Sequence, residues 1–348
     1  MQLRGLYHLS RELKAAYRGA DTRRRVRNFD GWMDQAATRD DTAVLYDHAE
    51  TVREYYDLCS EFMVFGWGDS LHFAPLSPGE SLEDSKARHQ RSMIAGLDLR
   101  EGMTVIDVGC GIGGPMRRVV REGRVRVVGI NSSEIQLNKA MLLNKEAGIG
   151  HQADYVRCNF MDMSVIPDNS FDRGYAIEST CHAPDKAAAF AEIYRVLKPG
   201  ALFWGQEMCM TDSFDPQDSR HQAIKQELMR GIALKSISTM GQVNRDLEMA
   251  GFQVVEGRDR AVEENFPTTA WYQPMESRHG TVGNALHRMP LGRKLFIGGA
   301  KLAEAFGVFP KGASNVIRLL DRTANAYVAG GRAGIFTPLY CFLARKPD

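Results

Sequence analysis

The feature that most constrains the fold is a glycine-rich turn between an expected strand and an expected helix. Residues 103–108 form a short run rich in β-branched side chains, and four of the next six residues, 109–114, are glycine. Residues 115–122 then predict a helix, with Pro115 in its first turn, where proline is tolerated. Because glycine lets the backbone approach a ligand closely, the segment predicts a strand, a ligand-binding loop and a helix in succession.

Strands and helices alternate along the chain that follows. Expected strands lie at 125–130, 155–158, 173–177, 201–207 and 252–255, and expected helices at 133–146, 185–197 and 239–250. This alternation is typical of a mostly parallel sheet with helices on both faces, which binds ligands beyond the carboxyl ends of its strands. A last strand is expected at 334–344, and the long stretch 261–333 before it is interpreted as an inserted or appended helical lobe.

Composition and charge restrict the class of protein. The chain has 348 residues, 44% of them hydrophobic, and a net charge of +1. These values are ordinary for a soluble globular protein of about two domains and give no support for nucleic-acid binding. The six cysteines lack CxxC spacing, which fits a reducing compartment. Neither a signal peptide nor a membrane span of about 18 apolar residues is recognised. We therefore expect an intracellular, cytoplasmic protein.

The glycine loop alone is compatible with a dinucleotide, because Gly109, Gly111 and Gly114 satisfy GxGxxG. Asp107, at the end of the expected strand, favours another ligand. A carboxylate there would repel a pyrophosphate, whereas it can pair with the ammonium group of S-adenosylmethionine. Asn131, after the second strand, could bind a ribose hydroxyl. A nicotinamide oxidoreductase stays a remote alternative.

Several further motifs are specific. They are FGWGDSLHF at 65–73, DVGCGIGGP at 107–115, YAIESTCHAP at 175–184, MTD at 210–212, WY at 271–272, FTP at 336–338 and ARKP at 344–347. Together they resemble the sterol C-24 methyltransferase family of S-adenosylmethionine-dependent enzymes, and the similarity runs from about Tyr55 to Pro347.

The resemblance implies an α/β fold: a Rossmann-like class I methyltransferase sheet with an antiparallel last strand, N-terminal helices and a C-terminal helical cap. The expected segments are a basic helical part (1–50), a lid and substrate-associated part (51–102), the cofactor-binding core (103–260), a substrate-capping insert (261–333) and the last core strand (334–348).

The implied reaction is methyl transfer from S-adenosylmethionine to the side-chain Δ24 double bond of a sterol in sterol biosynthesis. The alkene attacks the electrophilic methyl group, and the resulting carbocation shifts a hydride and loses a proton. Such a site must align the alkene with the methyl group, present aromatic faces to the cation, and supply a base for the last proton.

The residues and the resemblance together yield three groups of candidates. The catalytic candidates are Glu178, His182, Glu80 and His72. The expected cofactor-binding residues are Tyr56, Asp107, Gly109, Cys110, Gly111, Gly113, Asn131, Ser132, Gln136, Asn159, Phe160, Met161 and Glu178. The expected substrate-binding residues are Phe65, Trp67, Phe73, His89, Met208, Trp271 and Tyr272. No metal site is expected.

Each candidate has a structural alternative. Glu178 is favoured because it follows an expected strand and so lies at the carboxyl edge of the sheet. His89 could lie on a charged, solvated helix face, Glu80 could cap a helix, and Gln136 could complete a capping box. The aromatic residues could belong to the core, although the glycines within 65–73 favour a loop.

Five positions depart from the family. Met63, Val64, Phe65, Met208 and Asn159 stand where the family usually has Tyr, Glu, Tyr, Trp and Asp. The first four concern the expected substrate cavity, so methylation of another polyprenoid, such as an acyclic triterpene, is kept as an alternative. A catalytically silent sterol- or cofactor-binding protein is a second alternative. The exact sterol, the number of methyl transfers and the oligomeric state stay open, with a homo-oligomer among the alternatives.

Peripheral membrane association is predicted, because a sterol must be collected from a bilayer or a carrier. Residues 1–30 hold eight basic and three acidic side chains, and 291–309 combine apolar and basic residues like an interfacial helix. The competing interpretation, that the segment packs as a lid over the substrate, is favoured for Phe306 and Phe309. In a eukaryote, the expected membrane is the endoplasmic reticulum.

Overall fold

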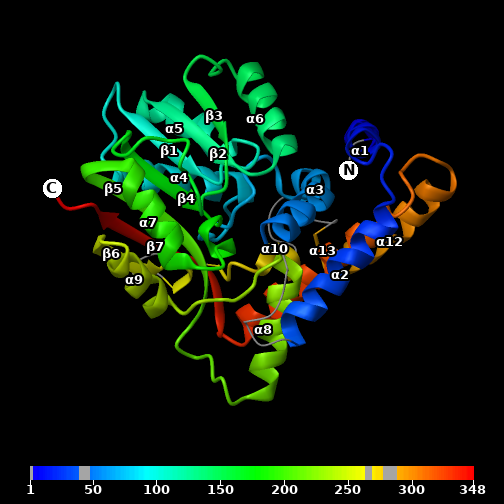
Figure 1. Cartoon of the computed structure of the whole chain (residues 1–348). Coiled ribbons are helices and arrows are strands. Elements are labelled where there is room, and N and C mark those ends of the chain that lie inside the picture. Colours follow the sequence, from blue (N-terminus) through cyan, green and yellow to red (C-terminus); the bar gives the residue numbers. More distant parts are fainter. Residues whose placement is uncertain (1–2, 39–47, 263–268, 277–287) are drawn as a thin grey trace.

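The computed structural model describes residues 3–38, 48–262, 269–276 and 288–348 (Figure 1). Its centre is a seven-stranded sheet in the order β3-β2-β1-β4-β5-β7-β6. The strands are β1 (Thr104–Val108), β2 (Arg126–Asn131), β3 (Ala153–Arg157), β4 (Phe171–Ile177), β5 (Leu197–Met210), β6 (Gln253–Asp259) and β7 (Phe336–Arg345). The first five pair in parallel, and β7 lies antiparallel between β5 and β6. The predicted α/β sheet with an antiparallel last strand is confirmed.

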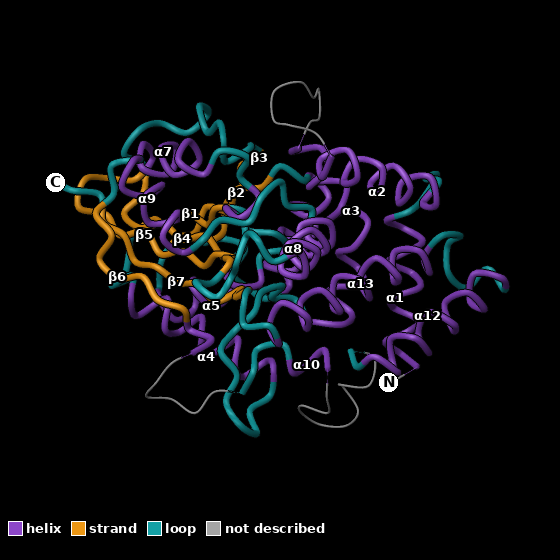
Figure 2. Tube along the Cα trace, turned by 90° about the horizontal axis from the view of Figure 1, so that it is seen from below, coloured by secondary structure: helices purple, strands orange, loops and turns teal. Residues whose placement is uncertain are grey.

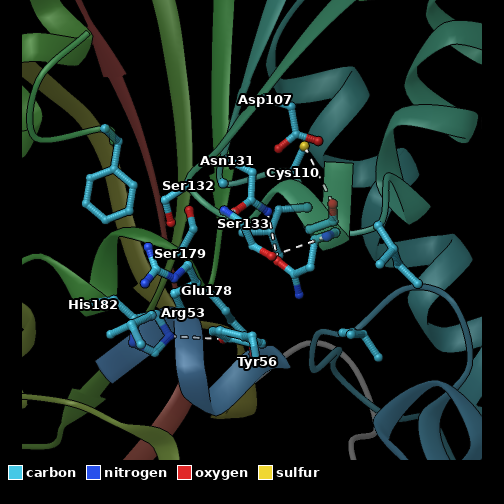
Figure 3. Close-up of a pocket in the computed structure, with 18 of the residues that line it drawn as sticks. Arg53, Tyr56, Asp107, Cys110, Asn131, Ser132, Ser133, Glu178, Ser179 and His182 are labelled. Carbon is cyan, nitrogen blue, oxygen red and sulfur yellow. Dashed lines mark hydrogen bonds between the residues drawn. The ribbon is translucent and has the colours of Figure 1, made fainter. Parts of the chain in front are cut away.

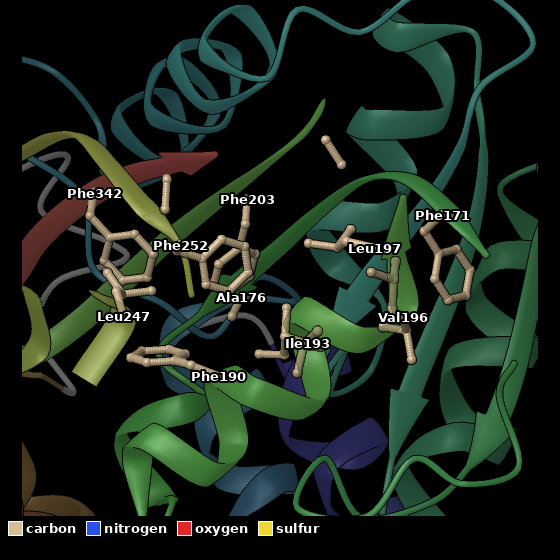
Figure 4. Packing of buried hydrophobic residues seen from close by; sticks show 14 of the residues in the cluster. Phe171, Ala176, Phe190, Ile193, Val196, Leu197, Phe203, Leu247, Phe252 and Phe342 are labelled. Carbon is tan, nitrogen blue, oxygen red and sulfur yellow. The ribbon is translucent and has the colours of Figure 1, made fainter. Parts of the chain in front are cut away.

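Helices cover both faces of this sheet. They are α4 (Leu82–Gly96), α5 (Gly114–Gly123), α6 (Glu134–Glu146), α7 (Lys186–Val196) and α9 (Met240–Met249). Alternation along β5 directs Phe203 toward α7 and α9, while its neighbour Trp204 packs in the core that contains α4 and α5. Figure 4 shows the first core, where Phe190 of α7 contacts the rings of Phe203 and Phe342.

The remaining helices form a second layer beside the sheet. They are α1 (Leu3–Ala16), α2 (Thr22–Thr38), α3 (His48–Trp67), α8 (Ser219–Ile232), the short α10 (Gln273–Glu276), α12 (Pro290–Ala305) and α13 (Ala313–Arg332). One hydrophobic cluster joins the N-terminal helices to α13, and its fully buried members include Leu13, Phe29, Leu58 and Val316. Both views show α1, α2, α3, α12 and α13 together on one side of the sheet (Figures 1 and 2).

Helices α10, α12 and α13 lie between β6 and β7 in the chain, where the substrate-capping insert 261–333 is predicted. Helix α8 was not predicted, and β6 extends four residues beyond its expected end. Helix α3 runs across the boundary predicted at residue 50 and ends only at Trp67, so the last six of the nine residues of the aromatic motif follow as a loop. The division into five segments stays a prediction. Within the described ranges, no helix combines the length and apolarity needed to cross a bilayer.

The outer face of α12 is apolar. Leu291, Leu295, Leu302 and Phe306 are exposed, Phe306 to 82%, and at about 100° per residue they fall within an arc of about 60°. Phe309 is buried in the cluster that also contains α1, α3 and α13. The interpretation as packing residues is therefore wrong for Phe306. Phe309 does pack, but against α1, α3 and α13 and outside the lining of the cavities, so a lid over the substrate stays a prediction.

Candidate active site

The glycine loop brings three segments into contact at the carboxyl end of β1. Gly109 has φ +83°, and a Cβ there would overlap the side chain of Ser179, which follows β4. A Cβ at Gly114 would overlap the backbone of Asp69 and Ser70 in the aromatic motif. Only glycine allows these approaches. The loops after β1 and β4 and the turn after α3 therefore meet at one place.

Asp107 is buried near the end of β1. Its Oδ2 accepts a hydrogen bond of 2.8 Å from the hydroxyl of Tyr175 in β4. Burial raises the pKa of Asp107 to about 7, against the opposing effect of the Tyr175 hydrogen bond. No cation is among the causes of this shift, so the carboxylate lacks a positive partner within the described residues.

A first cavity, of about 1160 Å³ and partly open to solvent, lies along these loops. Figure 3 shows Asp107 and Cys110 toward one end and Tyr56, Glu178 and His182 toward the other. The predicted cofactor residues that line it are Tyr56, Asp107, Gly109, Cys110, Gly111, Asn131, Ser132, Gln136, Asn159, Phe160, Met161 and Glu178. Gly113 lies behind the lining, where a Cβ would meet Asn144.

The residues that follow β2 form hydrogen bonds with one another. Asn131 Nδ2 donates to Gln136 Oε1 (2.8 Å), and Asn131 Oδ1 accepts from the amide of Ser133 (2.9 Å). Ser133 Oγ accepts from the amide of Gln136, as predicted for an N-cap. The reciprocal half of the capping box is absent, because Asn131 takes the Ser133 amide. Gln136 instead donates to Ser60 of α3 (3.1 Å).

Several lining residues were not found from the sequence. His48 and Arg53 of α3, together with Asp69, Leu71 and Ser179, also border the first cavity. Helix α3 begins more than 50 residues before the glycine loop, and no local pattern shows that its side chains reach that loop. The side chains of α3 reach the first cavity only because the glycine loop packs against the aromatic motif at the end of this helix.

A second cavity, of about 1120 Å³ and partly open to solvent, adjoins the first. Tyr56, Leu71, His72 and Glu178 line both cavities. The predicted substrate residues in its lining are Phe65, Trp67, Phe73 and Met208. Aromatic and aliphatic side chains of α3, α12 and α13 complete a mostly apolar wall.

Aromatic rings cluster where the cavities join. Phe73 makes edge-to-face contacts with Trp67 (5.2 Å between ring centroids), Tyr327 (5.0 Å) and Trp271 (5.3 Å). Trp271 is buried behind Phe73 and lies outside the lining. Tyr272 also lies outside it, since its ring packs where a side chain at Gly331 would stand. These two predicted substrate residues therefore support the wall from behind.

Glu178 occupies the junction. Its Oε1 accepts from the amide of Phe73 (2.6 Å) and from Nε2 of Gln206 (2.7 Å). Burial, opposed by the Phe73 amide and reinforced by the nearby charge of Glu207, raises the pKa of Glu178 to about 8. Its φ of +52° is unusual for a residue with a side chain, which marks a position held by its surroundings.

The other catalytic candidates are placed differently. His182 Nε2 lies 3.0 Å from the Tyr56 hydroxyl, and burial lowers the pKa of His182 to about 3, so the ring is neutral. In His72, Nδ1 bonds the Phe73 carbonyl (2.7 Å) and Nε2 bonds Gln90 (2.8 Å), so both nitrogens are engaged. Glu80 lies outside both cavities and pairs with Arg88 (2.8 Å), contrary to its prediction as a catalytic candidate.

His89 is not on a solvated helix face. It is 1% exposed, and its Nε2 bonds Gln206 Oε1 (2.7 Å) behind the cavity wall. Gln206, also missed from the sequence, connects His89 to Glu178 and to the carbonyl of Pro338 (3.0 Å). His89 is thus linked to Glu178 by hydrogen bonds through Gln206 and does not line either cavity.

A buried ion pair fixes the loop after β4. Lys186 Nζ lies 2.9 Å from Glu207 Oε2 and donates to the carbonyl of Thr180 (2.8 Å). The Thr180 hydroxyl donates to the other oxygen of Glu207. The charge of Glu207 raises the pKa of Lys186 despite the opposing, larger effect of burial. The ion pair and these hydrogen bonds therefore fix the position of the segment that carries Glu178 and His182.

Known proteins are similar to this chain in sequence. Residues 106–205 match the family described as methyltransferase domain, and residues 285–348 match sterol methyltransferase C-terminal. The cycloartenol-C-24-methyltransferase of Arabidopsis thaliana is 41% identical over 302 residues, which are 87% of this chain and 88% of that protein. The chain belongs to the sterol C-24 methyltransferase family. It is accordingly an S-adenosylmethionine-dependent sterol C-methyltransferase, and the oxidoreductase alternative is not supported.

Other relatives agree with this family. The sterol 24-C-methyltransferase ERG6 of Saccharomyces cerevisiae is 35% identical over 93% of this chain and 84% of its own length. The crystal structure of mycolic acid cyclopropane synthase CmaA1 superposes with a TM-score of 0.66 at 17% identity, covering 86% of this chain and 98% of that one. At that identity the likeness concerns the fold alone.

Proposed function

We propose that this enzyme transfers a methyl group from S-adenosylmethionine to C-24 of a sterol with a Δ24 side chain, at the junction of the two cavities. The observation that carries the proposal is the shared lining. Glu178, Tyr56, His72 and Leu71 face a cavity with polar loop residues on one side and an apolar cavity on the other. A water-soluble cofactor in the first cavity and a lipid in the second would therefore meet at this junction.

The first cavity fits the cofactor. Asp107 is a buried carboxylate without a cationic partner among the described residues, and it matches the positive charge of an amino-acid ammonium. Arg53 borders the same cavity and could bind the carboxylate, and Asn131 could bind the ribose. Phe160 and Met161 offer an apolar surface for the adenine. When bound, S-adenosylmethionine supplies an electrophilic methyl group.

The second cavity supplies what the alkene needs. Its apolar wall excludes water from the carbocation, and the faces of Trp67, Phe73 and Tyr327 surround the junction where that charge develops. Glu178 would accept the final proton on its carboxylate. Its pKa of about 8 is that of the cofactor-free protein, and a cation bound in the adjoining cavity favours the ionised, proton-accepting form.

The activity can be tested with labelled S-adenosylmethionine, a panel of Δ24 sterols and squalene, with products identified by mass spectrometry. We expect label in a C-24 methylated sterol and none in squalene. Methylation of squalene alone would favour the triterpene alternative. Tight S-adenosylhomocysteine binding without methylation of any alkene would instead support a silent binding protein.

Glu178 is tested as the base in the same assay. Glu178→Gln keeps the size of the side chain and its ability to accept from the Phe73 amide, but removes its basicity. We expect near-normal S-adenosylhomocysteine binding and a loss of turnover of about 100-fold or more. Full turnover would assign the proton to another acceptor, such as the Tyr56–His182 pair.

Peripheral membrane binding is proposed through α12. Leu295, Leu302 and Phe306 form the centre of its exposed apolar face, and Lys294 and Lys301 flank that face. Part of the basic excess of the N-terminus is neutralised, because Arg25 pairs with Glu54 and Arg23 lies 3.7 Å from Glu304. Helix α12 is therefore a better candidate than residues 1–30. The endoplasmic reticulum stays a prediction for a eukaryotic protein.

Point variants test this better than deletion of residues 1–40, since that deletion would expose the buried cluster at Leu13 and Phe29. We expect wild-type protein to float with anionic vesicles. The triple variant Leu295→Ser, Leu302→Ser, Phe306→Ser should stay in solution. Light scattering without lipid gives the oligomeric state. The alternative outcome is that wild-type protein does not float and has the mass of more than one chain, while the variant has the mass of one chain. That result would identify this face as a homo-oligomer interface.

A further inference from the structure

The hydrogen bonds to the Glu178 side chain are unevenly divided between its two carboxyl oxygens. Oε1 accepts both from the amide of Phe73 (2.6 Å) and from Nε2 of Gln206 (2.7 Å). Oε2 has no hydrogen-bond partner among the described residues, and Glu178 lines both cavities. A proton that arrives from the junction of the cavities therefore binds Oε2, while Oε1 stays bonded to the protein.

The side-chain amide of Gln206 fits its surroundings in one orientation only. Its Nε2 lies near three acceptors, which are Glu178 Oε1 (2.7 Å) and the carbonyls of Pro338 (3.0 Å) and Phe73 (3.3 Å). Because a carbonyl accepts and cannot donate, the end of the amide that faces them is the NH2 group. The oxygen of the Gln206 amide therefore faces the other way, toward His89 of α4.

His89 is consequently the donor to this amide. Its Nε2 lies 2.7 Å from Gln206 Oε1, so Nε2 carries the hydrogen. Its Nδ1 is buried without a hydrogen-bond partner among the described residues, and burial lowers the pKa of His89 to about 3, so the ring is neutral. Packing alone gives no reason for a histidine here, because an apolar side chain of similar size would avoid an unpaired buried nitrogen. The feature that distinguishes His89 is its hydrogen bond to Gln206.

We propose that Gln206 and His89 are positioning residues for the base: His89 holds the Gln206 amide in the orientation that donates to Glu178 Oε1, and this hydrogen bond directs Oε2 to the junction. The inference rests on the proposed function, in which Glu178 accepts the last proton. In that step a C–H bond of the carbocation breaks, its electron pair becomes the new double bond, and the proton binds Oε2. A donor to Oε1 also favours the ionised form of the carboxyl group, which is the form that accepts the proton.

Two amide substitutions at one position separate positioning from packing. The side-chain nitrogen of a glutamine lies at about the place of a histidine Nε2, and that of an asparagine at about the place of Nδ1. His89→Gln therefore keeps a donor to Gln206, and His89→Asn loses it. Both variants lose the ring contacts with His72 and Trp204, so a role in packing alone predicts equal effects.

The readout is the pH dependence of kcat, measured with saturating S-adenosylmethionine and a Δ24 sterol in detergent micelles. Wild-type turnover should fall at acidic pH as Glu178 becomes protonated. In His89→Asn the freed Gln206 amide can turn its oxygen toward Glu178. We therefore expect the acidic limb of the profile to move up by about one pH unit and the plateau of kcat to fall about tenfold.

The other variants follow from the same geometry. His89→Gln should recover most of the wild-type profile, and Gln206→Met, which removes the donor itself, should move the acidic limb at least as far as His89→Asn. KM for both substrates should stay at the wild-type value in all three, because neither residue lines a cavity. Each variant keeps the titratable groups around Glu178, which are Tyr56 of α3, His72 of the aromatic motif, Cys181 and His182 of the loop after β4, Glu207 of β5 and Tyr327 of α13.

His151→Asn is the control, because His151 is exposed, and it should keep the wild-type profile. S-adenosylhomocysteine binding reports folding, and if His89→Asn does not bind, Gln206→Met decides. An unshifted acidic limb in Gln206→Met, or equal losses in His89→Gln and His89→Asn, would overturn the positioning role. A wild-type profile without an acidic limb, or a limb that persists in the residual activity of Glu178→Gln, would instead overturn Glu178 as the base in the proposed function.

Discussion

The pH dependence of stability around Glu178 offers a quantitative test of the site. Burial raises the pKa of Glu178 from 4.5 to about 8 in the cofactor-free protein. Because the folded state favours the protonated form of Glu178, this group adds to the free energy of unfolding at low pH. Its contribution is complete below the ordinary pKa and is lost as pH rises toward 8. Each pKa change of one corresponds to about 1.4 kcal/mol, so wild-type protein should lose about 3 kcal/mol between pH 5.5 and 8.5 through this group.

Glu178→Gln removes the titration and keeps the shape of the protonated acid. The free energy of unfolding is measured by urea denaturation without cofactor. The value for Glu178→Gln minus the value for wild type should therefore increase by about 3 kcal/mol from pH 5.5 to pH 8.5. Glu80→Gln is the control. Its hydrogen bond to Arg88 lowers the pKa of Glu80, so its contribution is already complete at pH 5.5 and should stay constant above it. A pH-independent difference for Glu178→Gln would show that this carboxyl is not desolvated, and would refute the reasoning.

Three further predictions follow from the same geometry. Both S-adenosylmethionine and S-adenosylhomocysteine should bind more tightly as pH rises from 6 to 8, because both carry the ammonium group that pairs with Asp107, whose pKa is about 7. The gain should be larger for S-adenosylmethionine, because its sulfonium also favours the ionised form of Glu178; equal pH profiles by calorimetry would contradict this role of Glu178. Asp107→Asn should weaken S-adenosylmethionine binding about 10- to 100-fold in the same titration, whereas the exposed Asp154→Asn should not. Lys186→Met should lower the free energy of unfolding by about 3–5 kcal/mol, because it leaves Glu207 buried and unpaired. Glu207→Gln in the same chain should restore much of that loss, and chemical denaturation that shows no cost for Lys186→Met alone would sink this account.

Local patterns predicted much of the core. The features predicted in this way are the glycines of the 109–114 loop, the alternation of strands and helices, and the cap at Ser133, and all depend on residues near one another in the chain. Asp107 was recognised because strand, carboxylate and loop are adjacent in sequence. Each of these features is decided by backbone sterics and side-chain periodicity within a few residues.

Other residues of the site could not be predicted from local sequence patterns. Gln206 is one residue in a buried strand, and nothing beside it in the sequence shows that it bonds Glu178 and His89. His89 lies within a run of charged residues that suggests a surface, yet it is buried because α4 packs against the sheet. Arg53 reaches the first cavity only because α3 lies beside the glycine loop.

What the sequence by itself determined is the nature of the chemistry: a sheet edge with a glycine loop and a carboxylate, and the motifs of one enzyme family. What only the tertiary structure decided is which side chains share one place and which lose water. Phe306 and Phe309 stand three residues apart in the same segment, and one is exposed while the other is buried. Desolvation, and with it the pKa of Glu178, depends on segments far apart in the chain, because water is excluded only where those segments pack together.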